Sequence, residues 1–306
     1  MANPKQKITI VVSAKNIKAV QAQMRALGGT TGKTTKGMGM MVGAMATATI
    51  AFYAMSRAVK AVMGTYAEFQ QGMANVKAIS GATGVQFLKL EDSAKKLGRS
   101  TKFTATQVSE LQTEYAKLGF STKEILKAQS ATLALASAVG AELATSAEVA
   151  GNTLRGFGLE ADETSRVTDV MALSFSRSAL DMNKFSDSMK YVAPVAKMAG
   201  VSLEGTTAIM GALANAGISG SMAGTSLREV MLRAGQQGTA LSEAMGKPVE
   251  SFDDFIAGIK KMKKDGFDPM ESGLDAVGKR AIPAFGIILD NIDSIDNIED
   301  SLKNAV

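Results

Sequence analysis

Apolar residues recur at intervals of three and four along most of the chain after Tyr66. Four such stripes run from Phe87 to Leu97, Val108 to Leu118, Val167 to Phe175 and Met182 to Val192. This spacing places apolar side chains on one face of an α-helix, whereas a strand would alternate them with polar ones. The region is therefore predicted to be a series of amphipathic helices.

Glycines separate these helices at fairly even intervals, with one longer gap between Gly158 and Gly200; they are Gly119, Gly140, Gly158, Gly200 and Gly217. A glycine can adopt the left-handed conformation that ends a helix, and a hydrophobic residue after it can fold back onto that helix. New helices are expected to begin at capping boxes, in which Thr104 faces Gln107, Ser121 faces Glu124 and Thr145 faces Glu148. Pro194 falls inside a helical pattern, so it should kink or split its helix.

Short helices joined by tight links pack as antiparallel hairpins. The predicted fold class is therefore all-α: an array of short antiparallel helical hairpins, either an irregular bundle or solenoid-like. The strict self-similarity of a named repeat is missing. A short strand at Lys7–Ser13 and a long apolar helix are expected to precede this array.

Charge and composition suggest four domains. Nine Lys and Arg but no Asp or Glu precede Glu68, which leaves the rest of the chain with a net charge of −4. Such a basic arm can approach DNA, an anionic membrane or an acidic protein. The predicted divisions are a basic N-terminal arm of strand plus helix at 1–36, an uncharged apolar helix at 37–65, a core helical domain at 66–246, and a C-terminal helical extension at 247–306. This extension stops without a cap and is expected to be truncated.

The segment Gly37–Ser56 has no charged residue and is long enough to cross a bilayer as a helix. It is rich in Gly, Ala, Thr and Met, so a helix buried in a protein bundle is the alternative interpretation. Gly39 and Gly43 form a G-x-x-x-G pair, which allows helices to approach closely in lipid or in protein. The pair therefore predicts self-association as a homo-oligomer.

The chain has no His, Cys or Trp. It therefore lacks the usual ligands of structural zinc, the residues of a disulfide and the commonest general base. The sequence GGTTGKTT at Gly28–Thr35 resembles a phosphate-binding loop, but Leu27 stands where that motif needs its first glycine. We expect no catalytic residue, no metal and no cofactor, and predict that the protein is not an enzyme.

The most specific segment is Gly200–Gly235, which predicts a helix, a glycine-rich turn from Gly217 to Gly224, and a second helix carrying Arg228 and Arg233. It resembles the core region of bacteriophage tail tape measure proteins, whose pattern "G-x-x-G-x-x-A-G-T-x-L-R" matches Gly217, Gly220, Ala223, Gly224, Thr225, Leu227 and Arg228. The resemblance extends from about Phe69 to Phe285, through FQQGMANVKAISGATG, LGRSTKFTATQ, LGFSTKEIL, GNTLRGFGLEADE and GKRAIPAF.

The resemblance implies a structural protein that scaffolds the tail tube, determines tail length and assists DNA ejection. It implies a place in the lumen of the tail tube, in the host cytoplasm during assembly, and in the host envelope on ejection. The implied partners are tail tube, tail tip or baseplate proteins and tail assembly chaperones, with a host membrane and transient DNA contact as further candidates. A membrane-active pore-forming protein is the alternative. Family members are usually much longer, so the chain is expected to be a fragment or to come from a short-tailed variant.

Overall fold

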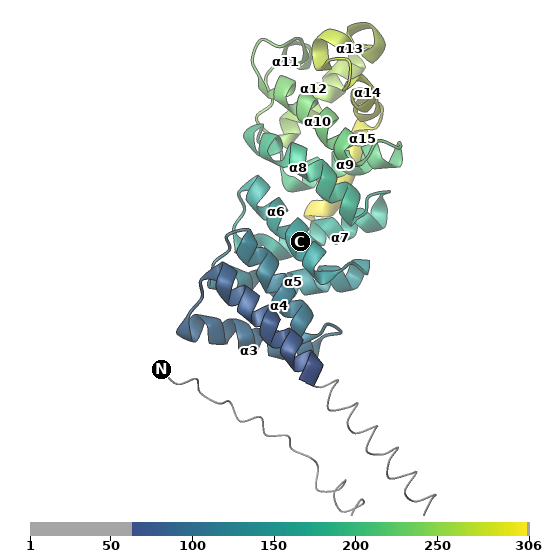
Figure 1. Ribbon diagram of the computed structural model, residues 1–306. Coiled ribbons are helices and arrows are strands. Elements are labelled where there is room, and N and C mark those ends of the chain that lie inside the picture. Colours follow the sequence, from purple (N-terminus) through teal and green to yellow (C-terminus); the bar gives the residue numbers. More distant parts are fainter. Residues whose placement is uncertain (1–62, 305–306) are drawn as a thin grey trace, which may run out of the picture. The chain divides into compact units, whose positions relative to one another are not determined.

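The computed structural model describes residues 63–304, and every regular element in that range is helical (Figure 1). The prediction of an all-α fold is thus confirmed for this part of the chain. The predicted strand at Lys7–Ser13, the apolar segment Gly37–Ser56 and its Gly39–Gly43 pair lie outside the described residues. The chain divides into two compact units, Met1–Ala67 and Glu68–Val306.

Most of the second unit is a two-layered stack of helical hairpins (Figure 1). Residues 63–80 are helical and precede the hairpins. Each helix of a layer packs against the helix two further along the chain. One layer contains α3 (Gly84–Ser100), α5 (Thr122–Val139), α7 (Thr164–Arg177) and α9 (Leu203–Asn215); the other contains α4 (Ala105–Lys117), α6 (Leu143–Phe157), α8 (Met182–Met198) and α10 (Gly220–Gly235).

The hairpins follow one another with a regular period. The starts of α4, α6, α8 and α10 are almost evenly spaced along the chain, whereas the interval between the starts of α5 and α7 is slightly longer. The longer interval contains an extra 3₁₀-helix, η1 (Ala161–Glu163). The glycine spacing does not show this period directly, because the link between α7 and α8 contains no glycine and both helices therefore lie between Gly158 and Gly200.

The predicted glycine caps are confirmed. The five glycines between the hairpin helices have φ angles of 67° to 88°. After four of them the next amide reaches back to the helix just ended: Phe120 N–H donates to Tyr115, Leu159 N–H to Leu154, Val201 N–H to Ala196, and Ile218 N–H to Leu213. These are the bonds of the Schellman motif, which satisfies carbonyls at the end of a helix.

Two of the three predicted capping boxes are confirmed. Thr104 and Ser121 each accept a hydrogen bond from the backbone three residues on, and the side chains of Gln107 and Glu124 accept from the capping residues' own amides. The third prediction is wrong, because α6 begins at Leu143, soon after the left-handed turn at Gly140, and so places Thr145 inside the helix. Helix α8 continues through Pro194 and is not split.

The stacked hairpins enclose a continuous apolar core. The predicted stripes all contribute to it: Leu90, Leu111, Val170 and Phe185 are fully buried. The layer of α4, α6, α8 and α10 also uses glycine at its crossings. A Cβ atom on Gly156 of α6 would lie 2.9 Å from the Cβ of Ala193 on α8, closer than such atoms approach in real proteins.

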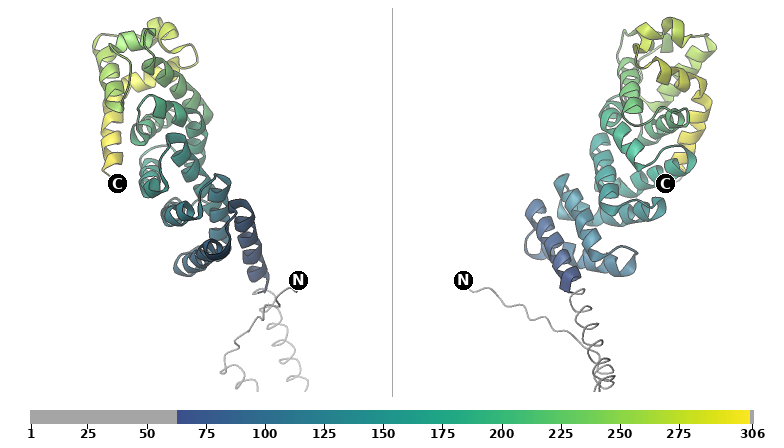
Figure 2. Two further views of the ribbon diagram at one scale, coloured as in Figure 1. Left: turned by 90° about the vertical axis from the view of Figure 1, so that its left-hand side faces the viewer. Right: turned by 45° about the vertical axis from the view of Figure 1, so that its right-hand side comes forward.

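Five further helices close the array beyond α10. They are α11 (Ala240–Met245), α12 (Phe252–Lys264), α13 (Pro269–Val277), α14 (Ile282–Asp290) and α15 (Ile292–Lys303). Helix α15 turns back and packs along α9 and α7 (Figure 2). The predicted core at 66–246 and extension at 247–306 thus lie, apart from residues 66–67, in one compact unit, and the domain division itself stays a prediction.

Candidate functional site

The family-like motif begins in the link between α9 and α10. Gly217 has a φ of 88°, and the amide of Ile218 donates back to Leu213 of α9. Helix α10 then begins at Gly220, directly after Ser219. The expected turn from Gly217 to Gly224 is therefore too long, and Gly224 lies inside the helix. Gly224 therefore serves helix packing instead of turn formation.

Gly224 marks the closest approach between α10 and α8. A Cβ atom at this position would lie 2.8 Å from the Cα of Ser188 and closer still to its carbonyl oxygen. The Ser188 hydroxyl donates to the carbonyl of Gly220 at 2.8 Å. Ala223 and Leu227 are buried on the same side of α10. Four residues of the motif therefore hold two helices in contact.

The other two motif residues, Thr225 and Arg228, are exposed and line a groove of about 480 Å³. The opposite wall is the turn between α13 and α14, which contains Gly278, Lys279 and Arg280. This turn opens the sequence GKRAIPAF. Two stretches that separately resemble the same family, and that are well separated in the chain, thus face each other across one groove.

An arginine on α10 joins this helix to α13 next to the groove. Arg233 donates to the carbonyl of Asp275 on α13 at 3.0 Å and to the carboxylate of Glu229 at 2.7 Å. The groove itself is basic. Among residues 63–304, no ion pair involves Arg228, Lys279 or Arg280. Their charges are therefore available to an acidic partner.

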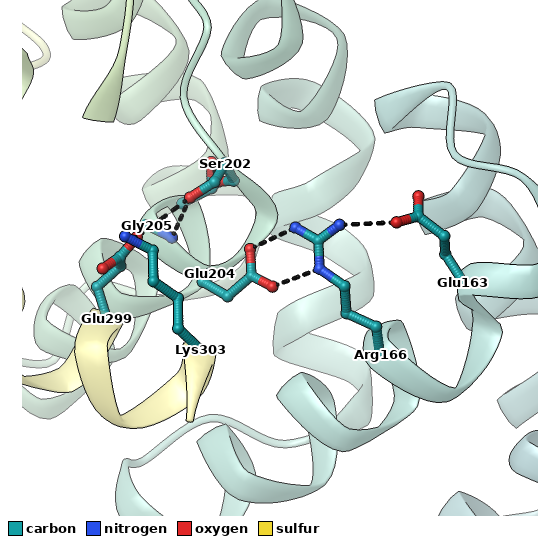
Figure 3. A network of polar contacts seen from close by, with 8 residues as sticks. Glu163, Arg166, Ser202, Glu204, Gly205, Glu299 and Lys303 are labelled. Atoms are coloured by element: carbon teal, nitrogen blue, oxygen red, sulfur yellow. Dashed lines mark hydrogen bonds and ion pairs between the residues drawn. The ribbon is translucent and has the colours of Figure 1, made fainter. Parts of the chain in front are cut away.

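A polar network around the buried carboxylate of Glu204 joins α7 and α9 beside α15 (Figure 3). The guanidinium of Arg166 binds both oxygens of Glu204, at 2.7 and 2.9 Å, and also reaches Glu163 at 3.0 Å. Glu204 is only 2% exposed. These carboxylates, Glu204 above all, raise the pKa of Arg166 above its ordinary value. The bidentate geometry thus supplies the positive charge that a buried carboxylate requires.

Helix α15 brings a second buried carboxylate to the same region, that of Glu299 (Figure 3). Its oxygen lies 2.7 Å from the ammonium of Lys303 and 3.5 Å from the hydroxyl of Ser202, the residue that caps α9. Burial raises the pKa of Glu299, and the ion pair with Lys303 only partly opposes this. The sequence did not predict the network, because its members come from three helices far apart in the chain.

The described range holds neither a metal site built on carboxylates nor a membrane-spanning helix. No group of three or more carboxylates among residues 63–304 is placed to hold a metal ion. No helix in that range combines the length and hydropathy needed to span a membrane.

Helical hairpins that each pack on their neighbours define a helical-repeat protein. Residues 91–306 match the family model described as phage-related minor tail protein, and the chain belongs to this family. It is 38% identical over 187 residues to the tape measure protein of Pneumococcus phage Dp-1, and 35% identical over 177 residues to the probable tape measure protein of Escherichia phage P2. The resemblance to tail tape measure proteins is thereby confirmed.

The matched region covers 61% and 57% of this chain but only 16% and 22% of those two relatives. The chain thus spans a small part of the length of the curated proteins it matches. No solved structure matches it.

Proposed function

We propose that this chain is a structural segment of a tail tape measure protein, which scaffolds the tail tube, determines tail length and assists DNA ejection. Membership of the minor tail protein family and the names of both relatives support this role. The comparisons give no support to a pore-forming protein. The proposed location is the virion, in the lumen of the tail tube, after assembly in the host cytoplasm.

The main support for the proposal is the sequence identity of 38% and 35% to two tape measure proteins, each over more than half of the chain. The fold adds a physical reason why this segment acts as a scaffold. Stacked hairpins present a long, continuous surface, on which many weak contacts with neighbouring proteins can form together. The array itself is compact, so we expect tail length to be measured by helical segments outside it.

Tail length in assembled particles tests the role. In a phage that carries the complete gene, an in-frame deletion of about 100 residues from a helical segment outside the array should shorten the tail by ~150 Å, at a rise of ~1.5 Å per residue. A duplication of the same segment should lengthen the tail by a similar amount. Electron micrographs measure both effects, and tails of unchanged length would contradict the ruler role.

We infer that the basic groove beside α10 binds an acidic surface of a tail tube, tail tip or baseplate protein, or of an assembly chaperone. Three cations face it, and the fold fixes both walls. The double variant Arg228→Glu and Lys279→Glu should sharply reduce the number of complete tails. The matched control is Lys123→Glu on α5, a cation far from the groove. Equal numbers of tails from both variants would contradict this role.

The Gly39–Gly43 pair stays a prediction, together with membrane entry of Gly37–Ser56 and DNA contact by the basic arm. We propose that the full chain associates with liposomes through this segment, and that Gly43→Arg abolishes the association, because a charge within the predicted apolar helix opposes insertion. Lack of association in the unaltered chain would remove the membrane role. A salt-independent gel shift would remove the DNA role.

A further inference from the structure

The helical array has two ends, formed by different helices. Helix α3 is at the end next to residues 63–80, and α13 is at the opposite end (Figures 1 and 2). In a stack of hairpins, the end helices are covered on one side only, so their outer faces usually become polar. Both end helices of this array depart from that rule.

The outer face of α3 is apolar at its start and basic further on. Its inner face buries Leu90 and Ala94. On the opposite side, Val85 is 68% exposed and Leu88 is 54% exposed, one helical turn apart. Three exposed cations continue the same side of the helix, against a single exposed carboxylate, Asp92; they are Lys89, Lys96 and Arg99. Among residues 63–304, none of these three forms an ion pair.

The outer face of α13 has the same apolar feature with the opposite charge. Its inner face buries Gly273, Ala276 and Val277. Met270 is 83% exposed and Leu274 is 59% exposed, again one turn apart. The exposed carboxylates of Glu271 and Asp275 flank this pair. An exposed apolar pair bordered by charges of one sign is typical of a contact surface.

We propose that two copies of the chain bind head to tail, with α3 of one copy packed against α13 of the next. The apolar pairs would cover each other, and the cations of α3 would face the carboxylates of α13. Such a contact joins two different surfaces, so it generates a ring of copies if the rotation closes and an open string if it does not. Two short helices bury little area, so the contact is weak. It is a property of the array and does not depend on the tail role.

Cysteine cross-linking tests this contact directly, because the chain has no cysteine of its own. One full-length copy carries Val85→Cys and a second, of different tagged size, carries Met270→Cys. Under mild oxidation, the mixed disulfide dimer should exceed either homodimer severalfold. The control pairs Val85→Cys with Met198→Cys, a methionine that is 78% exposed on α8, away from both ends. A mixed yield no higher than this control would overturn the proposal, as would a predominant Val85→Cys homodimer.

Charge reversal tests the pairing of signs. Lys89→Glu together with Lys96→Glu in the Val85→Cys copy should lower the mixed yield severalfold. Glu271→Lys together with Asp275→Lys in the other copy should then restore it. All four positions are exposed, so the array should stay folded, and circular dichroism checks this. A yield of mixed disulfide dimer that neither charge reversal changes would overturn the contact as described.

Discussion

Replacement of Gly224 by alanine measures how closely α8 and α10 must approach. The new Cβ atom would lie 2.8 Å from the Cα of Ser188 and would also meet its carbonyl oxygen. These are backbone atoms, so no side chain can rotate away, and the two helices must move apart. Overpacking of this kind costs about 1–3 kcal/mol. The better helix propensity of alanine offsets up to about 1 kcal/mol of this loss of stability.

We therefore expect Gly224→Ala to lower the free energy of unfolding by about 1–2 kcal/mol, which lowers Tm by roughly 2–8 °C for a unit of this size. The matched control is Gly286→Ala, in the middle of α14. A Cβ atom there meets nothing within 4 Å, so only the propensity acts and stability should rise by about 0.5–1 kcal/mol. Urea unfolding followed by circular dichroism compares the two. If Gly224→Ala is as stable as the unaltered protein, the packing argument is wrong.

Three further predictions concern buried polar groups and their partners. Arg166→Ala should lower the free energy of unfolding by about 3 kcal/mol, because it leaves Glu204 buried without a partner. The double variant Arg166→Met with Glu204→Leu should lower it far less. Equal losses of the two variants in urea unfolding would refute this. The pKa of Glu299 is raised in the folded state, so the folded chain holds its proton to higher pH than the unfolded chain, and stability falls as pH rises through that window. The stability of Glu299→Gln relative to the unaltered protein should therefore increase as the pH rises above the ordinary pKa of a glutamate, and a constant difference would contradict the assignment. Tyr115→Phe removes the 2.6 Å hydrogen bond to Thr132 and should cost about 1 kcal/mol in the same assay.

The sequence predicts the helices well because the relevant signals are local. A glycine cap or a capping box involves residues within one helical turn. The helix end at Gly158 and the helix start at Ser121 can therefore be predicted from the neighbouring residues alone. The predicted capping box at Thr145 is wrong because a local pattern alone does not fix where a helix begins. Its residues fit the pattern, but the chain already enters the helix at Leu143, after the turn at Gly140.

The site could be predicted only in part, because its residues meet through packing between distant segments. Arg166 and Glu204 are separated in the chain by about one hairpin period, and only the stacking of α7 on α9 makes them neighbours. The role of Gly224 was misread as a turn, since a glycine inside a helix and one in a loop look alike without the partner helix. The groove beside Arg228 depends on a turn that follows three helices later.

The return of α15 along α9 and α7 affects how the array comes apart. A stack of repeats usually frays from either end, one hairpin at a time. Here the hairpin of α9 and α10 cannot unfold by itself, because α15 packs across two successive hairpins. Detachment of α15 would expose Ile292, Ile295 and Leu302 along with the carboxylate of Glu299. Stepwise unfolding should therefore start at the α3 end. A pulling force applied there should detach hairpins in sequence, whereas the helices at the α15 end should unfold together in one cooperative step.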